Sequence, residues 1–305
     1  IMSMLPVAQG INSQVYRLTD RQKKCYALKF YQTPTKADPR NRRESEERFL
    51  VYMNECDLKF VPRLITISQN KDWSLLSWID GKKLKVLNTQ DIVEIAQRID
   101  LINLRRDLKS AKHLHLASEA CKSLPFMVQN LKSRIEKLKL VKATNDLDRE
   151  IGIWISDYLI SLANNAIAKA KRHESKTYWK NENICKIISP SDVGIHNTIR
   201  TNIGIAFVDF EYSGWDDICK LVCDWILQPE YLFSKDQTRA FVNEISNCAA
   251  CINDGWISRC NDIADLIKVK WITIMLKDYF SNKIDCKQWG KIKKYYKESS
   301  TEYFD

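Results

Sequence analysis

Residues 187–214 read IISPSDVGIHNTIRTNIGIAFVDFEYSG. The pattern predicts the end of one strand, a polar loop and then a pair of short strands, the second of which ends in acid. Asp192 and Asn197 lie five positions apart in the loop, and Asp209 ends the second strand. Two carboxylates and a carboxamide at this spacing can hold magnesium and orient a hydroxyl group, as phosphoryl transfer from a nucleotide requires. The rest of the chain must then supply a phosphate-binding lobe before this stretch and a substrate-binding lobe after it.

Length and composition indicate a globular protein of two packed lobes. The chain has 305 residues, of which 45% are apolar, and only 8 are Gly and 7 are Pro. These values suit two cores and argue against long flexible linkers. The first residues, IMSMLPVAQG, lack the pattern of a signal peptide, and no apolar run approaches the roughly 20 residues that cross a bilayer. We therefore expect a cytoplasmic protein with no membrane span; the sequence leaves the oligomeric state open.

The net charge and the cysteine spacing limit the kinds of ligand that the protein is expected to bind. The formal net charge is +10, and the basic residues are spread along the chain with no RNA-binding or zinc-finger motif. This favours a protein that handles anionic small molecules over one that binds nucleic acid or anionic lipid. Cys248 and Cys251 form one C-x-x-C, but no second close pair of ligands completes a zinc site. The ten cysteines are expected to be reduced and mostly buried.

The first thirty residues predict a β-hairpin that carries a lysine. Strand-like runs cover residues 15–18 and 25–30, and a polar loop with Gly10, Asn12 and Ser13 precedes them. Such a loop can present N–H groups to phosphate oxygens, although with one glycine it can also be an ordinary hairpin turn. Lys29 lies on the next strand, in the order in which kinases place a phosphate-binding lysine. The alternative is a lysine on a solvated face.

Residues 44–56 predict a helix that could carry the partner of this lysine. Phe49, Leu50 and Met53 form one apolar stripe, and Glu46 lies one turn before Leu50. In a kinase-like lobe this helix supplies the glutamate that pairs with the strand lysine. Register favours Glu46, with Glu44 and Glu47 as alternatives. A solvated acidic first turn is the simpler interpretation.

The remaining pattern divides the chain near residue 80. Residues 60–67 and 73–79 predict two more strands, so residues 1–80 form a small, mostly antiparallel sheet with one helix. Ser77, Trp78 and Ile79 would form the connector to the second lobe. Residues 81–305 are mainly helical. Helices are expected at residues 91–104, 126–140 and 148–171 and within 237–296, and short strands at 184–188, 198–200 and 205–210.

These segments together resemble the aminoglycoside phosphotransferase and choline kinase superfamily, whose α+β fold is bilobal and protein-kinase-like. The resemblance is carried by QGINSQVYRL, YALKF, ESEERFLVYM, FVPRLI, LLSWIDG, SPSDVGIHN and FVDFEYSGWDD, in that order. Within the superfamily the chain looks most similar to uncharacterised bacterial phosphotransferases with an S-P-S-D-x-G-x-H-N loop. The resemblance implies a small-sheet N-lobe with one helix and a larger helical C-lobe.

The resemblance also implies an activity and a role for each matching residue. The activity would be ATP- and Mg²⁺-dependent phosphorylation of a hydroxyl on a small molecule, such as a sugar or an amino alcohol. The implied roles are Asp192 as catalytic base, Asn197 and Asp209 as magnesium ligands, Lys29 held by Glu46 on the nucleotide phosphates, Asn12 and Ser13 in the phosphate-covering loop, and Ser77, Trp78 and Ile79 on the adenine.

Two departures from the superfamily pattern keep alternatives open. Pro190 and Ser191 stand where relatives carry His-x before the aspartate, and the glycine loop is sparse. A non-catalytic, kinase-like nucleotide-binding module is therefore the alternative function. Glu211 follows Asp209 where protein kinases have glycine, and could touch metal or substrate or serve as an ion-pair or helix-cap residue. A protein kinase is disfavoured because no A-P-E-like segment follows.

Overall fold

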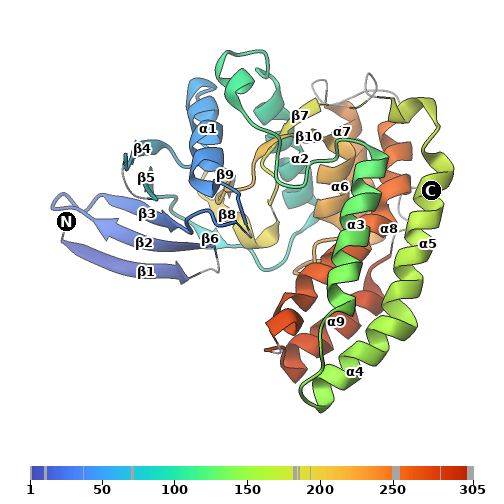
Figure 1. Ribbon diagram of the computed structural model, residues 1–305. Coiled ribbons are helices and arrows are strands. Elements are labelled where there is room, and N and C mark those ends of the chain that lie inside the picture. Colours follow the sequence, from blue (N-terminus) through green and yellow to red (C-terminus); the bar gives the residue numbers. More distant parts are fainter. Residues whose placement is uncertain are drawn as a thin grey trace. The chain divides into compact units, whose positions relative to one another are not determined.

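A computed structural model describes residues 2–9, 12–36, 38–69, 72–180, 184, 186–192, 194–248, 255–281 and 283–300. The chain forms two compact units (Figure 1). Unit 1 comprises Ile1–Glu119, Ile187–Trp215 and Asn247–Cys251, and unit 2 comprises Ala120–Lys186, Asp216–Ser246 and Ile252–Asp305. Within the described ranges, no helix is both long and apolar enough to cross a membrane.

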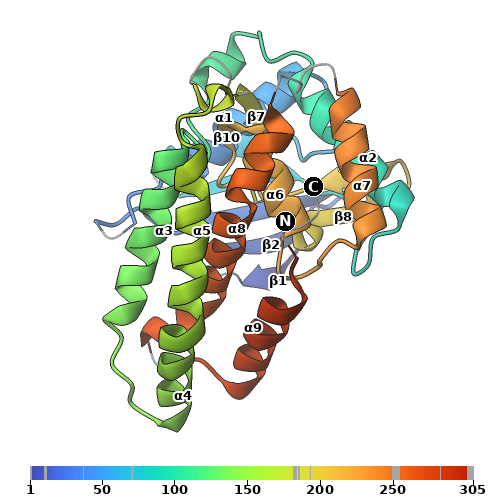
Figure 2. The same ribbon diagram turned by 90° about the vertical axis from the view of Figure 1, so that its right-hand side faces the viewer.

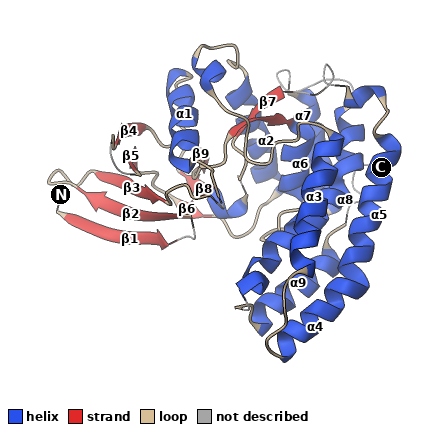
Figure 3. Ribbon diagram, viewed as in Figure 1, coloured by secondary structure: helices blue, strands red, loops and turns tan. Residues whose placement is uncertain are grey.

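A five-stranded antiparallel sheet forms the first part of unit 1 (Figures 1 and 3). Its order is β1-β2-β3-β5-β4. The strands are β1 (Ser3–Gln9), β2 (Ser13–Thr19), β3 (Cys25–Tyr31), β4 (Leu64–Ile67) and β5 (Trp73–Ser77). β3 is the central strand, so both of its edges are paired and its register is fixed from two sides.

The turn between β2 and β3 sets that register. The Asp20 carboxylate accepts hydrogen bonds from the backbone N–H groups of Gln22 and Lys24, at 2.8 and 2.9 Å. Such a side-chain-to-backbone bond stabilises a tight turn. Lys29 then lies opposite Val15 on β2 and Ser74 on β5.

Helix α1 (Arg42–Glu55) begins at Asn41, whose side chain accepts a hydrogen bond from the backbone N–H of Glu44. One face of the helix is buried, and Glu46 shares it with Phe49, Leu50 and Met53. The Phe49 ring stacks on the Phe210 ring with centroids 4.5 Å apart. The predicted helix is confirmed, and its apolar stripe brings Glu46 into the interior of unit 1.

The remaining elements of unit 1 include those that residues 187–214 form. They are β6 (Lys82–Lys83), α2 (Thr89–Asn103), the 3₁₀ turns Ser110–His113 and Ile195–Asn197, β7 (Lys186–Ser189), β8 (Thr198–Thr201), β9 (Gly204–Phe207) and β10 (Gly214–Asp217). β6, β8 and β9 form one small sheet, and β7 pairs with β10. Asn103 at the end of α2 exchanges two hydrogen bonds with the Ile188 backbone, which fixes the strand before the Asp192 loop.

Gly81 permits β6 to approach β8 closely. A Cβ atom at Gly81 would lie 2.4 Å from the backbone oxygen of Arg200. That separation is too short for any side chain unless the backbone moves.

Unit 2 is helical in all its long elements (Figure 3). It contains α3 (Leu124–Lys139), α4 (Asp146–Trp154), a π turn (Ile155–Leu159), α5 (Ile160–His173), the 3₁₀ turn Thr177–Trp179, α6 (Ile218–Ile226), α7 (Lys235–Asn247), α8 (Trp256–Met275), the 3₁₀ segment Leu276–Ser281 and α9 (Cys286–Glu298). α3, α5 and α8 pack side by side (Figure 2). Their contact faces carry the apolar residues of the core.

Several expectations for the elements need correction. The strand predicted at residues 205–210 ends at Phe207, so Asp209 lies two residues beyond β9 and does not end it. Strand β1 was not predicted, because its apolar side chains do not alternate and Pro6 interrupts it; the register shifts between Pro6 and Ala8. Residues 60–63 are not strand, since the ladder begins at Leu64 after Pro62, which has no N–H to donate. The predicted helix 148–171 is divided by the π turn. The predicted lobe boundary near residue 80 stays a prediction.

Candidate active site

A cavity of about 280 Å³ lies within unit 1. Its polar side chains include Lys29, Glu46, Lys83, Asn197 and Asp209. Apolar walls come from Val15, Ala27, Leu76 and Val208 among others. Ser77, Trp78 and Ile79 line it as well, so it holds seven of the ten residues predicted for the site. An apolar hollow with a few converging polar groups is the usual form of a small-molecule site.

Lys29 is the centre of the polar end. Its ammonium lies 2.7 Å from Glu46 Oε2, 2.5 Å from Asp209 Oδ1 and 3.6 Å from Glu211 Oε2. Lys29 itself is only 3% exposed. The alternatives for its partner do not reach it, because Glu44 pairs with Arg48 and Glu47 pairs with Arg43. Of the three candidate glutamates, the structure therefore places Glu46 against the lysine.

The charges of this cluster do not balance. Lys29, Arg42, Glu46, Asp209 and Glu211, which we name the lysine cluster, carry two positive and three negative formal charges. Burial lowers the pKa of Lys29, but the carboxylates of Asp209 and Glu46 more than offset it and raise that pKa well above its ordinary value. Lys29 therefore stays charged, and the lysine cluster as a whole carries an excess of negative charge.

Glu211 is the least well-satisfied member of the cluster. Its Oε1 lies 3.7 Å from Arg42 Nε, and within the described part of the chain its Oε2 accepts no hydrogen bond. Burial raises the pKa of Glu211 to about 6, against the lowering effect of Lys29. Of the roles left open for Glu211, the contacts seen are those of an ion-pair partner.

Asn197 and Asp209 offer the oxygens that a hard divalent cation prefers. The side chain of Asp209 is 36% exposed, unlike the other carboxylates of the lysine cluster. Asn197 donates from Nδ2 to the backbone oxygen of Asp192 at 2.8 Å, which commits its nitrogen to the loop. In the described ranges no group of three or more His, Cys, Asp or Glu side chains could hold a metal. Two protein ligands fit a magnesium ion that takes its other ligands from phosphates and water.

The loop of Asp192 is held by local contacts. The Asp192 side chain is partly exposed, and its Oδ1 lies 3.7 Å from His196 Nε2. Ser191 and Asp209 both have left-handed backbone conformations, with φ of 63° and 69°. Non-glycine residues in this region cost free energy and concentrate at functional sites. His196 follows the predicted base Asp192 in the sequence, whereas the loop histidine expected from the resemblance would precede it.

The two predicted phosphate-loop residues lie in different settings. Asn12 donates from Nδ2 to the Tyr212 hydroxyl at 2.7 Å, and Arg42 Nε donates to the same oxygen at 3.4 Å. Ser13 begins β2 and pairs with Tyr31. Gly10, the glycine of this predicted loop, lies outside the described residues.

The fold has known counterparts. An ethanolamine kinase from Plasmodium vivax superposes with a TM-score of 0.63 at 15% identity, covering 97% of this chain and 81% of that one. A spectinomycin phosphotransferase, in complex with ADP and spectinomycin, gives 0.67 at 11% identity over 99% and 91%. A choline kinase from Streptococcus pneumoniae gives 0.61 at 14% identity over 98% and 95%. The chain has the aminoglycoside phosphotransferase and choline kinase fold. Scans against family profiles and curated sequences return no match.

The predicted fold class, α+β and protein-kinase-like, is thereby confirmed. At identities of 9 to 15% the likeness establishes the phosphotransferase fold and leaves each residue's role to the chemistry of its site. Residues 187–214 contribute Asn197, Ile199, Val208 and Asp209 to the cavity of this fold.

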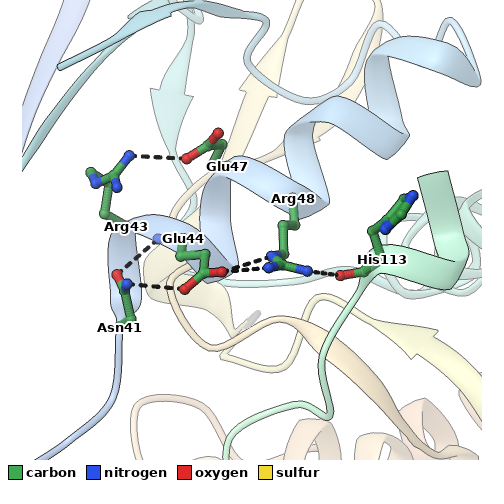
Figure 4. A pocket seen from close by; sticks show the side chains of 6 residues that line it. All are labelled: Asn41, Arg43, Glu44, Glu47, Arg48 and His113. Carbon is green, nitrogen blue, oxygen red and sulfur yellow. Dashed lines mark hydrogen bonds and ion pairs between the residues drawn. The ribbon is translucent and has the colours of Figure 1, made fainter. Parts of the chain in front are cut away.

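A second hollow, of about 400 Å³, lies beside the first turns of α1 (Figure 4). Its charged side chains pair with one another: Arg43 with Glu47 at 3.0 Å, and Arg48 with Glu44 at 2.5 Å. Arg48 also donates to the His113 backbone oxygen at 2.5 Å. These contacts fasten the outer face of α1, while Glu46 projects from its buried face.

Sequence reasoning missed two residues of this candidate site. Tyr31 is buried and donates to Glu46 Oε2 at 2.7 Å. The alternation of β3 could have found it, because residues two apart on a strand share a face and Tyr31 follows Lys29 by two. Arg42 carried no such signal, since its approach to Glu211 and Tyr212 depends on the tertiary fold.

Proposed function

We propose that this protein is a kinase that transfers the γ-phosphoryl group of ATP, with Mg²⁺, to a hydroxyl group of a small molecule such as a sugar or an amino alcohol. The observation that carries the proposal is the meeting of Lys29, Glu46, Asn197 and Asp209 in one cavity whose other walls are mostly apolar. The phosphotransferase fold shared with the structural neighbours supports this proposal. A kinase supplied with cellular ATP suits the cytoplasm, and we propose that location.

The cavity walls support nucleotide binding. The purine would lie against the apolar side chains and the segment of Ser77, Trp78 and Ile79. That segment is anchored, because the Ser77 N–H donates to the Arg63 oxygen and the Ser77 hydroxyl accepts from the Arg63 N–H, both at 2.8 Å. An anchored wall places the base without a cost in ordering at the moment of binding.

The polar end supports phosphate and metal binding. Lys29 is a fixed, charged donor for phosphate oxygens, and Glu46 holds it. Asn197 and Asp209 would hold the magnesium, which supplies charge neutralisation for the phosphates when bound. The excess negative charge of the lysine cluster favours such a cation.

The reaction then requires a base for the substrate hydroxyl and in-line attack of its oxygen on the γ-phosphorus. Asp192 would accept the proton of the substrate hydroxyl as its oxygen bonds to the γ-phosphorus. The bond from that phosphorus to the β,γ-bridging oxygen breaks, and ADP leaves. Asn197 contributes to this step by holding the Asp192 backbone at 2.8 Å. His196, 3.7 Å from the carboxylate, supports its orientation in the absence of the loop histidine.

The test combines binding and turnover. Wild-type protein should melt at higher temperature with Mg²⁺ and ATP, since a ligand that binds the native state stabilises it by mass action. It should also release ADP in the presence of at least one sugar or amino alcohol, and EDTA should abolish both effects. Asp192→Asn should keep the metal-dependent shift and lose about 10²- to 10⁴-fold in turnover.

Each outcome separates the candidates. A magnesium-dependent shift with no turnover on any acceptor would indicate the non-catalytic nucleotide-binding module. Absence of a shift at millimolar ATP would contradict nucleotide binding altogether. Equal turnover by wild type and Asp192→Asn would remove Asp192 from the mechanism.

A further inference from the structure

The Glu46 carboxylate accepts hydrogen bonds from three donors. Its Oε2 accepts from Lys29 Nζ and from the Tyr31 hydroxyl, both at 2.7 Å. Its Oε1 accepts from the backbone N–H of Phe210 at 3.0 Å. Glu46 is 1% exposed. A buried carboxylate with this many donors is held in one orientation, and two of its donors share a single oxygen.

Tyr31 touches both members of the Lys29–Glu46 pair. It ends β3 two residues after Lys29 and therefore faces the same side of the sheet. The Lys29 ammonium lies 5.1 Å from the centre of the Tyr31 ring. The backbone N–H of Tyr31 donates to the backbone oxygen of Asp72 at 2.8 Å, so the backbone of Tyr31 is fixed as well.

We propose that Tyr31 is a positioning residue, whose hydroxyl holds Glu46 so that Lys29 stays directed at the nucleotide phosphates. This inference rests on the proposed kinase function and adds a residue to it. The hydroxyl takes part of the acceptor capacity of Oε2, which Lys29 would otherwise use alone. Lys29 then keeps hydrogens for Asp209 and for a phosphate oxygen.

Removal of the hydroxyl has a defined consequence. With the tyrosine donor gone, Glu46 would turn or draw Lys29 closer, and the ammonium would offer less to a phosphate. The loss would appear in nucleotide affinity. A hydroxyl that merely satisfied a buried atom would change stability and leave that affinity alone.

The experiment compares Tyr31→Phe with Tyr26→Phe. Tyr26 lies on the same strand, and its hydroxyl donates to Asp20 at the β2–β3 turn, at 3.3 Å, away from Lys29 and Glu46. Both changes keep the ring, so both variants should fold, which circular dichroism at the assay temperature verifies. We expect Tyr31→Phe to raise the KM for ATP, and the Kd for Mg²⁺–ATP, about tenfold, as for loss of a hydrogen bond to a charged group. The kcat should change by less, and Tyr26→Phe should match wild type in both.

A double-mutant cycle with Glu46→Gln tests the route of the effect. If Tyr31 acts through Glu46, Tyr31→Phe should add less than about twofold in the Glu46→Gln background. Independent, additive effects would overturn the proposal, as would an unchanged Kd in Tyr31→Phe while wild type binds the nucleotide. If wild type itself binds no Mg²⁺–ATP, the kinase function fails, and the role of Tyr31 in it fails with it.

Discussion

Two lysines of this protein are equally buried and both face carboxylates. Lys29 in unit 1 and Lys220 in unit 2 are each 3% exposed. Lys220 lies 3.2 Å from Asp216 and 2.9 Å from Asp224, and Lys270 lies 2.5 Å from Asp224. Burial and ion pairing alone therefore do not distinguish a ligand site from a structural network.

The two clusters differ in charge balance and in access. Around Lys220 two lysines face two aspartates; the side chain of Asp216 is fully buried, and that of Asp224 is only 11% exposed. Around Lys29 the negative charges are in excess, and Asp209 opens on a cavity. A closed and balanced network contributes to the fold, whereas an open and unbalanced one retains affinity for a cation or an anion–metal complex. This difference predicts opposite responses to the removal of one charge.

The largest effect is expected for Asp209→Asn. Phosphoryl transfer should fall about 10³-fold or more, because the carboxylate proposed to hold the charge-neutralising magnesium is lost. The free energy of unfolding should hold or rise, since the change relieves repulsion among three carboxylates and asparagine tolerates the left-handed backbone. Steady-state assays and urea unfolding measure the two quantities. Full activity in Asp209→Asn would show that the open carboxylate is not part of the chemistry.

Asp224→Asn in unit 2 should lower the stability of the protein and leave its activity unchanged. Removing one partner from a buried ion-pair network costs about 3 kcal/mol of unfolding free energy, because Lys220 and Lys270 keep their charge. Activity per folded molecule should be retained. Asp236→Asn is the matched control, since Asp236 pairs with Arg239 at an exposed position of the same unit. Urea unfolding that gives equal stabilities for the two variants would contradict the difference between the clusters.

The smallest effect concerns Glu211 and pH. Its folded pKa of about 6 lies above the ordinary value of 4.5, so the native state binds this proton more tightly than the unfolded state. The associated stability is present below pH 4.5 and is lost as the pH rises through 6, by about 2 kcal/mol. Glu211→Gln should remove this part of the pH dependence. Unfolding in EDTA between pH 4 and 7 tests it, and parallel curves for the two proteins would refute the raised pKa.

Much of the site could be predicted because its residues follow periodic elements. The stripe of Phe49, Leu50 and Met53 fixed the register of α1, and with it the choice of Glu46. The alternation of β3 likewise put Lys29 on one face. Both depend on local periodicity, which survives without knowledge of the tertiary fold.

The rest depends on contacts between distant segments. The Asn12 amide meets Tyr212, which is 200 residues away in the chain, and no local pattern encodes that contact. The pairing of Glu211 with Arg42 is of the same kind. The interruption of the helix after Trp154 is a third case, because a π turn adds one residue to a pattern that otherwise continues. The roles assigned to Asp192 and Asn197 remain predictions until turnover is measured.

The close approach at Gly81 has a consequence for selective inhibitors. Gly81 lines the cavity, and a single added carbon there would meet the backbone of Arg200. Replacement by alanine should therefore displace β6 and alter this cavity without touching Lys29 or Asp209. A compound that fills the cavity beside Gly81 would contact this part of its wall. A substitution of Gly81 could weaken the binding of that compound only by straining the backbone that forms the wall.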